Sequence, residues 1–178
     1  VSAFLLNRSS DLLVFQETDY MISVLEGPVD DTNDYSYGNF DDGKELRLNY
    51  PTSFLRSIKE ANIQLVSIAN NHLLDKGESS FNNTLKNLND YNLDYIGEKN
   101  QTKIISIKGI KIGILAYSAF TNYEEEIFKE KINYLVEPSS KEFKLVKDTI
   151  KKDFQKLKQE NVDIIIVMPH YGTQFSER

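Results

Sequence analysis

The chain has 178 residues, of which 40% are hydrophobic and 27% are charged, a composition that is ordinary for one globular domain and excludes disorder throughout. The formal net charge of -6 provides no basic surface for a phosphate backbone, so we expect no nucleic acid partner. The chain has no cysteine, which excludes disulfides, thiolate metal ligands and a cysteine nucleophile.

Apolar spacing alternates between strand-like runs and helical repeats, which predicts an α/β fold. We expect a helix over about 11–19 that leads into a strand over 20–25. The stretch 30–45 is rich in Asp, Asn, Gly and Ser, which predicts a long solvated loop. A calcium-binding loop is the less favoured alternative, because Ser36 stands where that motif has glycine.

The middle of the chain contains five further predicted elements. They are a helix over 51–61, a strand over 65–69, a helix over 81–91, a short strand over 93–96, and a β-hairpin formed by 103–107 and 110–117. Because the hairpin strands are antiparallel whereas strands joined through helices are normally parallel, the predicted sheet is mixed.

The last third of the chain combines an irregular segment, a helix and a strand. No clean period is visible over 121–138, which we expect to be an irregular crossing segment. Ser139 and Glu142 fit a capping box for a helix that continues to about Gln159. Its six lysines favour a solvated helix face over a groove for a polyanion. A strand over 164–168 follows.

Polar side chains follow three of the predicted strands. Glu26 follows the first strand, Asn70-Asn71-His72 the second, and His170 the last; the chain has no other histidine. The carboxyl ends of strands in an open α/β sheet form the crevice where ligands bind, so we expect these side chains to converge. One histidine or one Asn pair after a strand is more often structural, and the hypothesis therefore depends on the agreement of three strand ends.

These residue types suit metal-dependent hydrolysis. Carboxylate, amide oxygen and imidazole are ligands of divalent metals in two-metal hydrolases. We predict that Glu26, Asn71 and His170 bind divalent metal, that two ions are present, and that His72 protonates a leaving group. Asp75 is predicted to accept the other imidazole N–H of His72 and to fix its tautomer. The sequence does not distinguish Mn, Zn and Fe.

The same residues lie in blocks that resemble the CapA family of poly-γ-glutamate capsule synthesis proteins. The blocks are Leu25–Pro28, Ser67–Gly77, Thr84–Leu88 with Tyr95–Gly97, Gly109–Tyr117 and His170–Gly172. The resemblance runs from about residue 11 to the end, and it implies a mixed-sheet α/β sandwich of the calcineurin-like metallophosphoesterase type. It also implies that Asn71 binds metal and that His72 is the acid. The chain departs from the family pattern at Val24, where Asn is usual, and at Tyr171, where Trp is usual.

The resemblance further implies one CapA-like domain over residues 1–178. We expect this domain to be partial, because the family's opening Gly-Asp strand and closing Gly-x-His-Pro-His segment are not in the sequence. The full-length protein is expected to lie outside the cytoplasmic membrane, anchored by an N-terminal segment.

Two functions remain open on this basis. The first is a metal-dependent hydrolase of the phosphoesterase type in capsule or envelope polymer metabolism, acting on an anionic polymer or a phosphate ester. The second is a non-catalytic subunit that holds poly-γ-glutamate or its membrane synthase subunits, because fold resemblance alone does not establish catalysis.

Overall fold

The computed structural model describes residues 17–35 and 46–172 and has the predicted α/β architecture. Its elements in chain order are β1 (Ile22–Val24), α2 (Ser53–Glu60), β2 (Leu65–Ser67), α3 (Gly77–Asp90), β3 (Asp94–Ile96), β4 (Lys103–Ile107), β5 (Ile110–Ser118), α4 (Glu125–Lys131), α5 (Phe143–Gln159) and β6 (Ile164–His170). The strands form two sheets of three, ordered β1-β2-β3 and β4-β5-β6. The first sheet is parallel, and the second is mixed because β4 is antiparallel to β5 while β6 is parallel to it.

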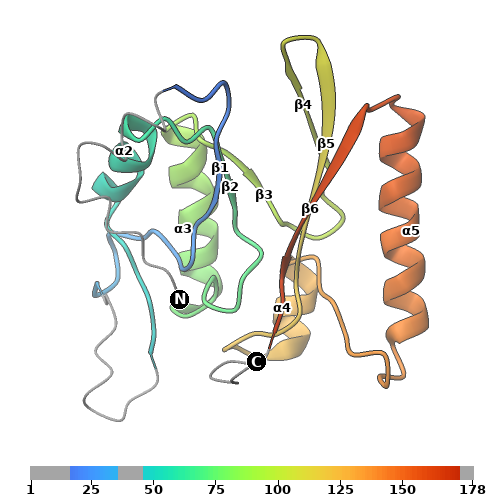
Figure 1. Cartoon of the computed structure of the whole chain (residues 1–178). Helices are drawn as coiled ribbons and strands as arrows, with labels where there is room; N and C mark the ends of the chain where they lie inside the picture. The colour runs from blue at the N-terminus through green and yellow to red at the C-terminus, as the bar shows by residue number, and fades with distance from the viewer. Residues whose placement is uncertain (1–16, 36–45, 173–178) are drawn as a thin grey trace.

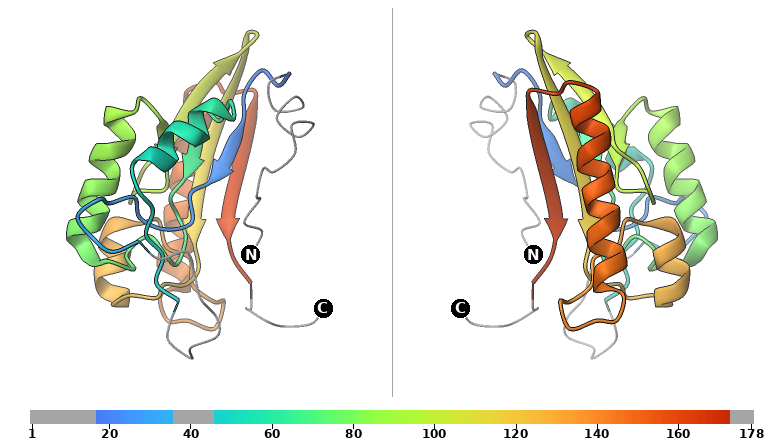
Figure 2. Two further views of the ribbon diagram at one scale, coloured as in Figure 1. Left: turned by 90° about the vertical axis from the view of Figure 1, so that its left-hand side faces the viewer. Right: turned by 90° about the vertical axis from the view of Figure 1, so that its right-hand side faces the viewer.

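The elements lie in layers. Helices α2 and α3 cover one side of the strands and α5 covers the opposite side, with the two sheets between them (Figures 1 and 2). The larger hydrophobic core takes residues from both sheets, for example Leu65 of β2 and Ile114 of β5, each fully buried. Because both sheets contribute to this core, the ends of β1, β2, β5 and β6 are held in a fixed relation to one another.

Strand β5 is buried on both faces, and this explains its continuous apolar sequence. Successive side chains of a strand point to opposite faces. Ile114 and Ala116 therefore join the larger core, whereas Leu115 and Tyr117 join a second cluster with Leu157 of α5. The Tyr117 hydroxyl donates to the Asp153 carboxylate at 2.8 Å, and burial followed by this carboxylate raises the Tyr117 pKa. Helix α5 is thus fastened to β5 by apolar packing and one buried polar contact.

Two sequence predictions about the segment before α5 are wrong. The segment 121–138 contains the helix α4, which has only one buried residue, Phe128, so it shows no apolar period. Its acidic first turn and basic last turn instead match the helix dipole. Ser139 and Glu142 do not form the predicted capping box: α5 begins at Phe143, and the Ser140 hydroxyl accepts the Glu142 N–H at 3.2 Å.

The amino-terminal predictions are only partly covered by the described residues. Residues 11–16 of the predicted first helix and residues 36–45 of the predicted loop lie outside them, and residues 17–19 are in a turn and a bend. The described start of the loop is irregular as predicted, but Asp30 is 1% exposed rather than solvated. Its carboxylate accepts the backbone N–H of Thr32 at 2.9 Å and the Asn33 amide at 2.7 Å, which explains how it can be buried.

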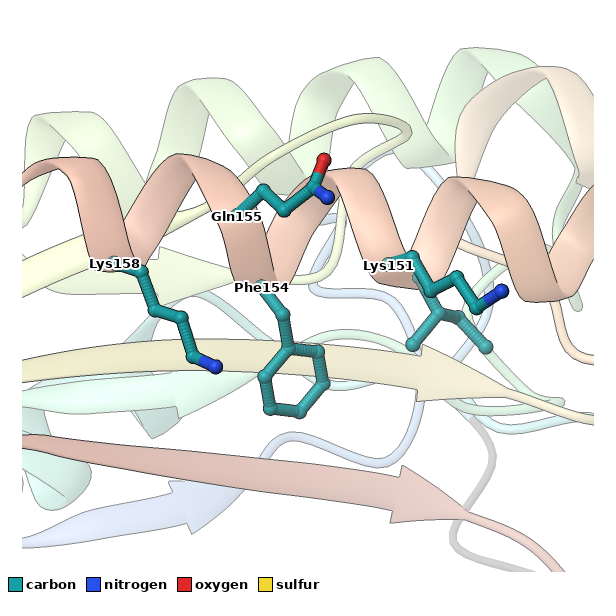
Figure 3. A pocket seen from close by; sticks show the side chains of 5 residues that line it. Lys151, Phe154, Gln155 and Lys158 are labelled. Carbon is teal, nitrogen blue, oxygen red and sulfur yellow. The ribbon is translucent and has the colours of Figure 1, made fainter.

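The outer face of α5 is polar, as predicted. All six of its lysines are exposed. A hollow on this helix is lined by Ile150, Lys151, Phe154, Gln155 and Lys158, and none of the predicted site residues borders it (Figure 3). The side chains of Phe154 and Lys158 extend toward the strands in this view, whereas Gln155 extends away from them. In the part of the chain that the structure describes, no helix has the length and apolarity needed to traverse a bilayer.

Candidate functional site at the strand ends

Asn70, which had no separate role in the sequence analysis, joins the ends of β1 and β2. Its side-chain NH2 donates to the backbone oxygen of Leu25 at 2.7 Å, and its Oδ1 accepts the backbone N–H of His72 at 3.0 Å. The residue is fully buried. Asn70 thus fixes the turn that carries Asn71 and His72 relative to the strand end that carries Glu26.

Asn71 and His170 are in direct contact across the two sheets. The Nε2 of His170, the last residue of β6, lies 2.8 Å from the Oδ1 of Asn71, which follows β2. Asn71 is 5% exposed and His170 is partly buried. Burial lowers the pKa of His170, the nearby Glu26 charge raises it, and His72 lowers it again, with a net result below the ordinary value. His170 is therefore mainly neutral at physiological pH, the form in which an imidazole binds metal.

His72 and Asp75 form a buried pair. The Nδ1 of His72 lies 2.6 Å from the Oδ2 of Asp75, and the same oxygen accepts the backbone N–H of Leu48 at 2.7 Å. Their exposed fractions are 5% and 3%. Because a carboxylate only accepts hydrogen bonds, this contact places a proton on Nδ1 and leaves Nε2 of His72 for other partners. The geometry is the one the sequence predicted for this pair.

Glu26 interacts with the other residues through its charge. It follows β1, is partly buried, and its charge raises the pKa of His170 and contributes to the raised pKa of Tyr50, after burial of the Tyr50 ring. The Asp75 charge acts on Tyr50 in the same direction. Glu26, Asp75 and His170 are thus close enough to interact electrostatically around one region.

Asn122 is a member of the site that the sequence analysis missed. Its backbone N–H donates to the backbone oxygen of Asn71 at 3.0 Å, and its Oδ1 accepts the Asn71 side-chain NH2 at 3.0 Å. Its own NH2 lies 3.0 Å from the His72 Nδ1 and 3.5 Å from the Asp75 Oδ1. Asn122 follows β5 by four residues, so the strand-end rule that selected the other residues applies to it as well.

The donor atoms can be compared with the needs of a divalent metal. Two atoms that bind one ion at adjacent positions, at roughly 2.1 Å each, lie about 3 Å apart. The 2.8 Å between Asn71 Oδ1 and His170 Nε2 fits that requirement, and Glu26 offers a carboxylate nearby. However, the described residues contain no group of three or more His, Asp or Glu side chains placed to hold a metal ion. The residues present therefore fit part of the coordination sphere of one ion.

The comparisons with known proteins agree on one family. The family described as Bacterial capsule synthesis protein PGA_cap matches residues 9–178. The "Capsule biosynthesis protein CapA" of Bacillus anthracis is 23% identical over 174 residues, which is 92% of this chain and 39% of that protein. The "PGA biosynthesis protein CapA" of Bacillus subtilis (strain 168) is 25% identical over 167 residues, which is 91% of this chain and 41% of that protein. The chain thus spans about two fifths of the length of these relatives.

Proposed function

Because the chain belongs to the bacterial capsule synthesis protein family PGA_cap, we propose that it acts in capsule polymer biosynthesis as part of a metal-dependent hydrolase of the phosphoesterase type. The polymer we propose is poly-γ-glutamate, in line with the names of the two CapA relatives. The observation that supports hydrolysis is the contact between Asn71 and His170, next to the buried pair of His72 and Asp75. On this proposal, the residues that bind metal lie beside the residue that donates a proton.

In this proposal Asn71, His170 and Glu26 hold a divalent metal ion. Amide oxygen, imidazole and carboxylate form a mixed donor set that Mn, Zn and Fe all accept, and a second ion would need ligands in addition to these three. A bound divalent ion supplies Lewis acidity toward a phosphoryl oxygen. The hydrogen bond that the His72 backbone N–H donates to the Asn70 side chain and the packing of both sheets hold the metal-binding atoms in place beforehand.

His72 acts as the general acid. The Asp75 carboxylate holds the proton on Nδ1, so the nitrogen available to a substrate is Nε2. In the imidazolium form, Nε2 gives its proton to the leaving oxygen of a phosphate ester, and Asp75 stabilises the positive ring before the transfer. The buried setting of this pair strengthens the stabilisation, because the local dielectric is low.

A non-catalytic role is the second candidate, and one specific observation favours it. Among the described residues, no group of three or more His, Asp or Glu side chains is placed to bind a metal. On this alternative the chain holds poly-γ-glutamate or the membrane subunits of its synthase at the cell surface without turning over a substrate. In the protein that carries this chain, an extracytoplasmic, membrane-anchored location fits both candidates.

The two candidates are separated by an assay with an activated phosphate ester, p-nitrophenyl phosphate, in buffers that contain Mn²⁺ or Zn²⁺. On the hydrolase proposal, His72→Ala abolishes turnover and keeps the bound metal, whereas His170→Ala loses the metal. Turnover that survives in both variants would refute the assigned roles. Absence of turnover and of bound metal in the wild-type protein would favour the binding role.

A further inference from the structure

The amide of Asn71 can face His170 with either of two groups. Its oxygen and its NH2 have nearly the same size, so packing alone does not choose between them. Only the oxygen can bind a metal. The orientation that presents the oxygen must therefore be set by the hydrogen-bond partner on the other side of the amide, and that partner is Asn122.

The orientation of Asn122 is in turn set by Asp75. Each oxygen of the Asp75 carboxylate only accepts hydrogen bonds, and Oδ2 is used by His72 Nδ1 and by the Leu48 N–H. The other oxygen, Oδ1, lies 3.5 Å from the Asn122 NH2. The same NH2 lies 3.0 Å from the His72 Nδ1, whose own proton is directed to the Asp75 Oδ2. An NH2 group there is attracted by the carboxylate, whereas an oxygen would be repelled by it. The Asn122 oxygen then faces the other way, toward the NH2 of Asn71.

The geometry points to Asn122 as a positioning residue that transmits the orientation set by Asp75 to the amide of Asn71, so that the Asn71 oxygen faces His170. This inference rests on the proposed function, because the oxygen would then be available to a divalent metal. Asp75 would thus orient the His72 ring directly. Through Asn122, it would also orient the Asn71 amide, so that the oxygen proposed to bind metal faces His170. The Asn122 backbone N–H donates to the Asn71 backbone oxygen at 3.0 Å, which keeps the two residues in register.

The chain offers a readout that needs neither metal nor turnover. An Asn oxygen opposite His170 requires a proton on the His170 Nε2, whereas an Asn NH2 there would require the proton on Nδ1. The chain has two histidines, so a ¹⁵N-histidine correlation spectrum of the metal-free protein near pH 8 contains two rings only. We expect His72 to carry its proton on Nδ1 and His170 to carry its proton on Nε2.

The test compares Asn122→Ala with a control, Asn133→Ala. Asn122 is exposed, whereas Asn133 is buried at 4% exposure, and the Asn133 side chain bonds to the backbone of Asn100 and Ala116 and not to the site. In Asn122→Ala the Nε2 preference of His170 should be lost, and the Mn²⁺ dissociation constant should rise about 10- to 100-fold. Asn133→Ala should retain both properties.

Three results would overturn the inference. They are a proton on Nδ1 of His170 in the wild-type protein, an unchanged His170 ring in Asn122→Ala, and equal Mn²⁺ affinities of Asn122→Ala and the wild-type protein. If Asn122→Ala does not fold, the wild-type spectrum still decides which atom of Asn71 faces His170. If the wild-type protein binds no Mn²⁺, the metal-site proposal fails, while the His170 tautomer still decides the role of Asn122.

Discussion

The Nε2 of His170 lies 2.8 Å from the Oδ1 of Asn71, although the two residues are 99 positions apart in the chain. The contact joins the end of β6 in the mixed sheet to the turn after β2 in the parallel sheet. Any movement of one sheet against the other would separate these atoms. The shared hydrophobic core therefore has a direct consequence for the site, because it keeps the two sheets in one arrangement.

Asp75→Asn should damage the site more than the fold. The substitution removes the carboxylate that holds the His72 proton on Nδ1, so turnover of p-nitrophenyl phosphate should fall by about 10- to 100-fold. Loss of a buried acceptor should also lower the free energy of unfolding by roughly 1–3 kcal/mol. Asp153→Asn is the control, since Asp153 is a buried carboxylate whose partner, Tyr117, belongs to the second cluster with Leu157. It should lower stability in urea but leave turnover intact, and equal turnover losses in the two variants would contradict the account.

Gly97→Ala should be strongly destabilising, because two separate constraints act at this position. Gly97 has φ of +136°, and an added Cβ would lie 2.7 Å from the backbone nitrogen of Ala69, just before the turn with Asn71. We expect a loss of roughly 1–3 kcal/mol from the steric conflict, in addition to the backbone strain. Gly109→Ala isolates the strain, since Gly109 has φ of +84° and no atom within 4 Å of the added Cβ. Urea unfolding should rank Gly97→Ala as the less stable variant, and the reverse order would refute the steric explanation.

Asp30→Asn should change how stability depends on pH. Burial raises the pKa of Asp30, but hydrogen bonds from Thr32 and Asn33 lower it, and the net pKa lies below its ordinary value. A lowered folded-state pKa means that Asp30 stabilises the fold at neutral pH and that this contribution is lost as the pH falls below about 4. The variant should therefore be less stable than the wild type by roughly 1–3 kcal/mol at pH 7, with a smaller difference in acid.

The exposed Glu130→Gln variant controls for the loss of one carboxylate from the surface. Urea unfolding at several pH values between neutral and acid gives the comparison. A difference between Asp30→Asn and wild type that stays constant over this range would show that the ionised Asp30 does not stabilise the fold.

The helices and strands with long apolar patterns could be predicted from the sequence. Helix α3 has a stripe that includes Phe81 and Leu88, both buried, and β5 has a continuous apolar run. Helix α4 could not be found in this way, because a helix of seven residues with Phe128 as its one buried side chain has no period to detect. The division into two sheets also has no local signal, since it depends on β6 pairing with β5 across the intervening α4 and α5.

Some residues of the candidate site could also be predicted from the sequence, and one could not. Glu26, Asn71, His72 and His170 were selected because each follows a strand, and the structure places Asn71 in contact with His170 and His72 in contact with Asp75. Their roles in metal binding and proton transfer stay predictions. Asn122 was missed because it lies in a segment without a clear pattern, and its importance depends on side-chain contacts with residues about 50 positions earlier. Such contacts are a property of the tertiary fold and are not encoded in local spacing.

The central claim is that Asn71, Glu26 and His170 bind a divalent metal, and equilibrium binding of Mn²⁺ tests it most directly. The measurement compares the wild-type protein with His170→Ala, and uses Asn133→Ala to control for the loss of a buried polar side chain outside the site. We expect saturable binding by the wild type and by Asn133→Ala, and a loss of binding in His170→Ala. Identical Mn²⁺ binding by the wild type and His170→Ala, or no binding by the wild type, would contradict the account.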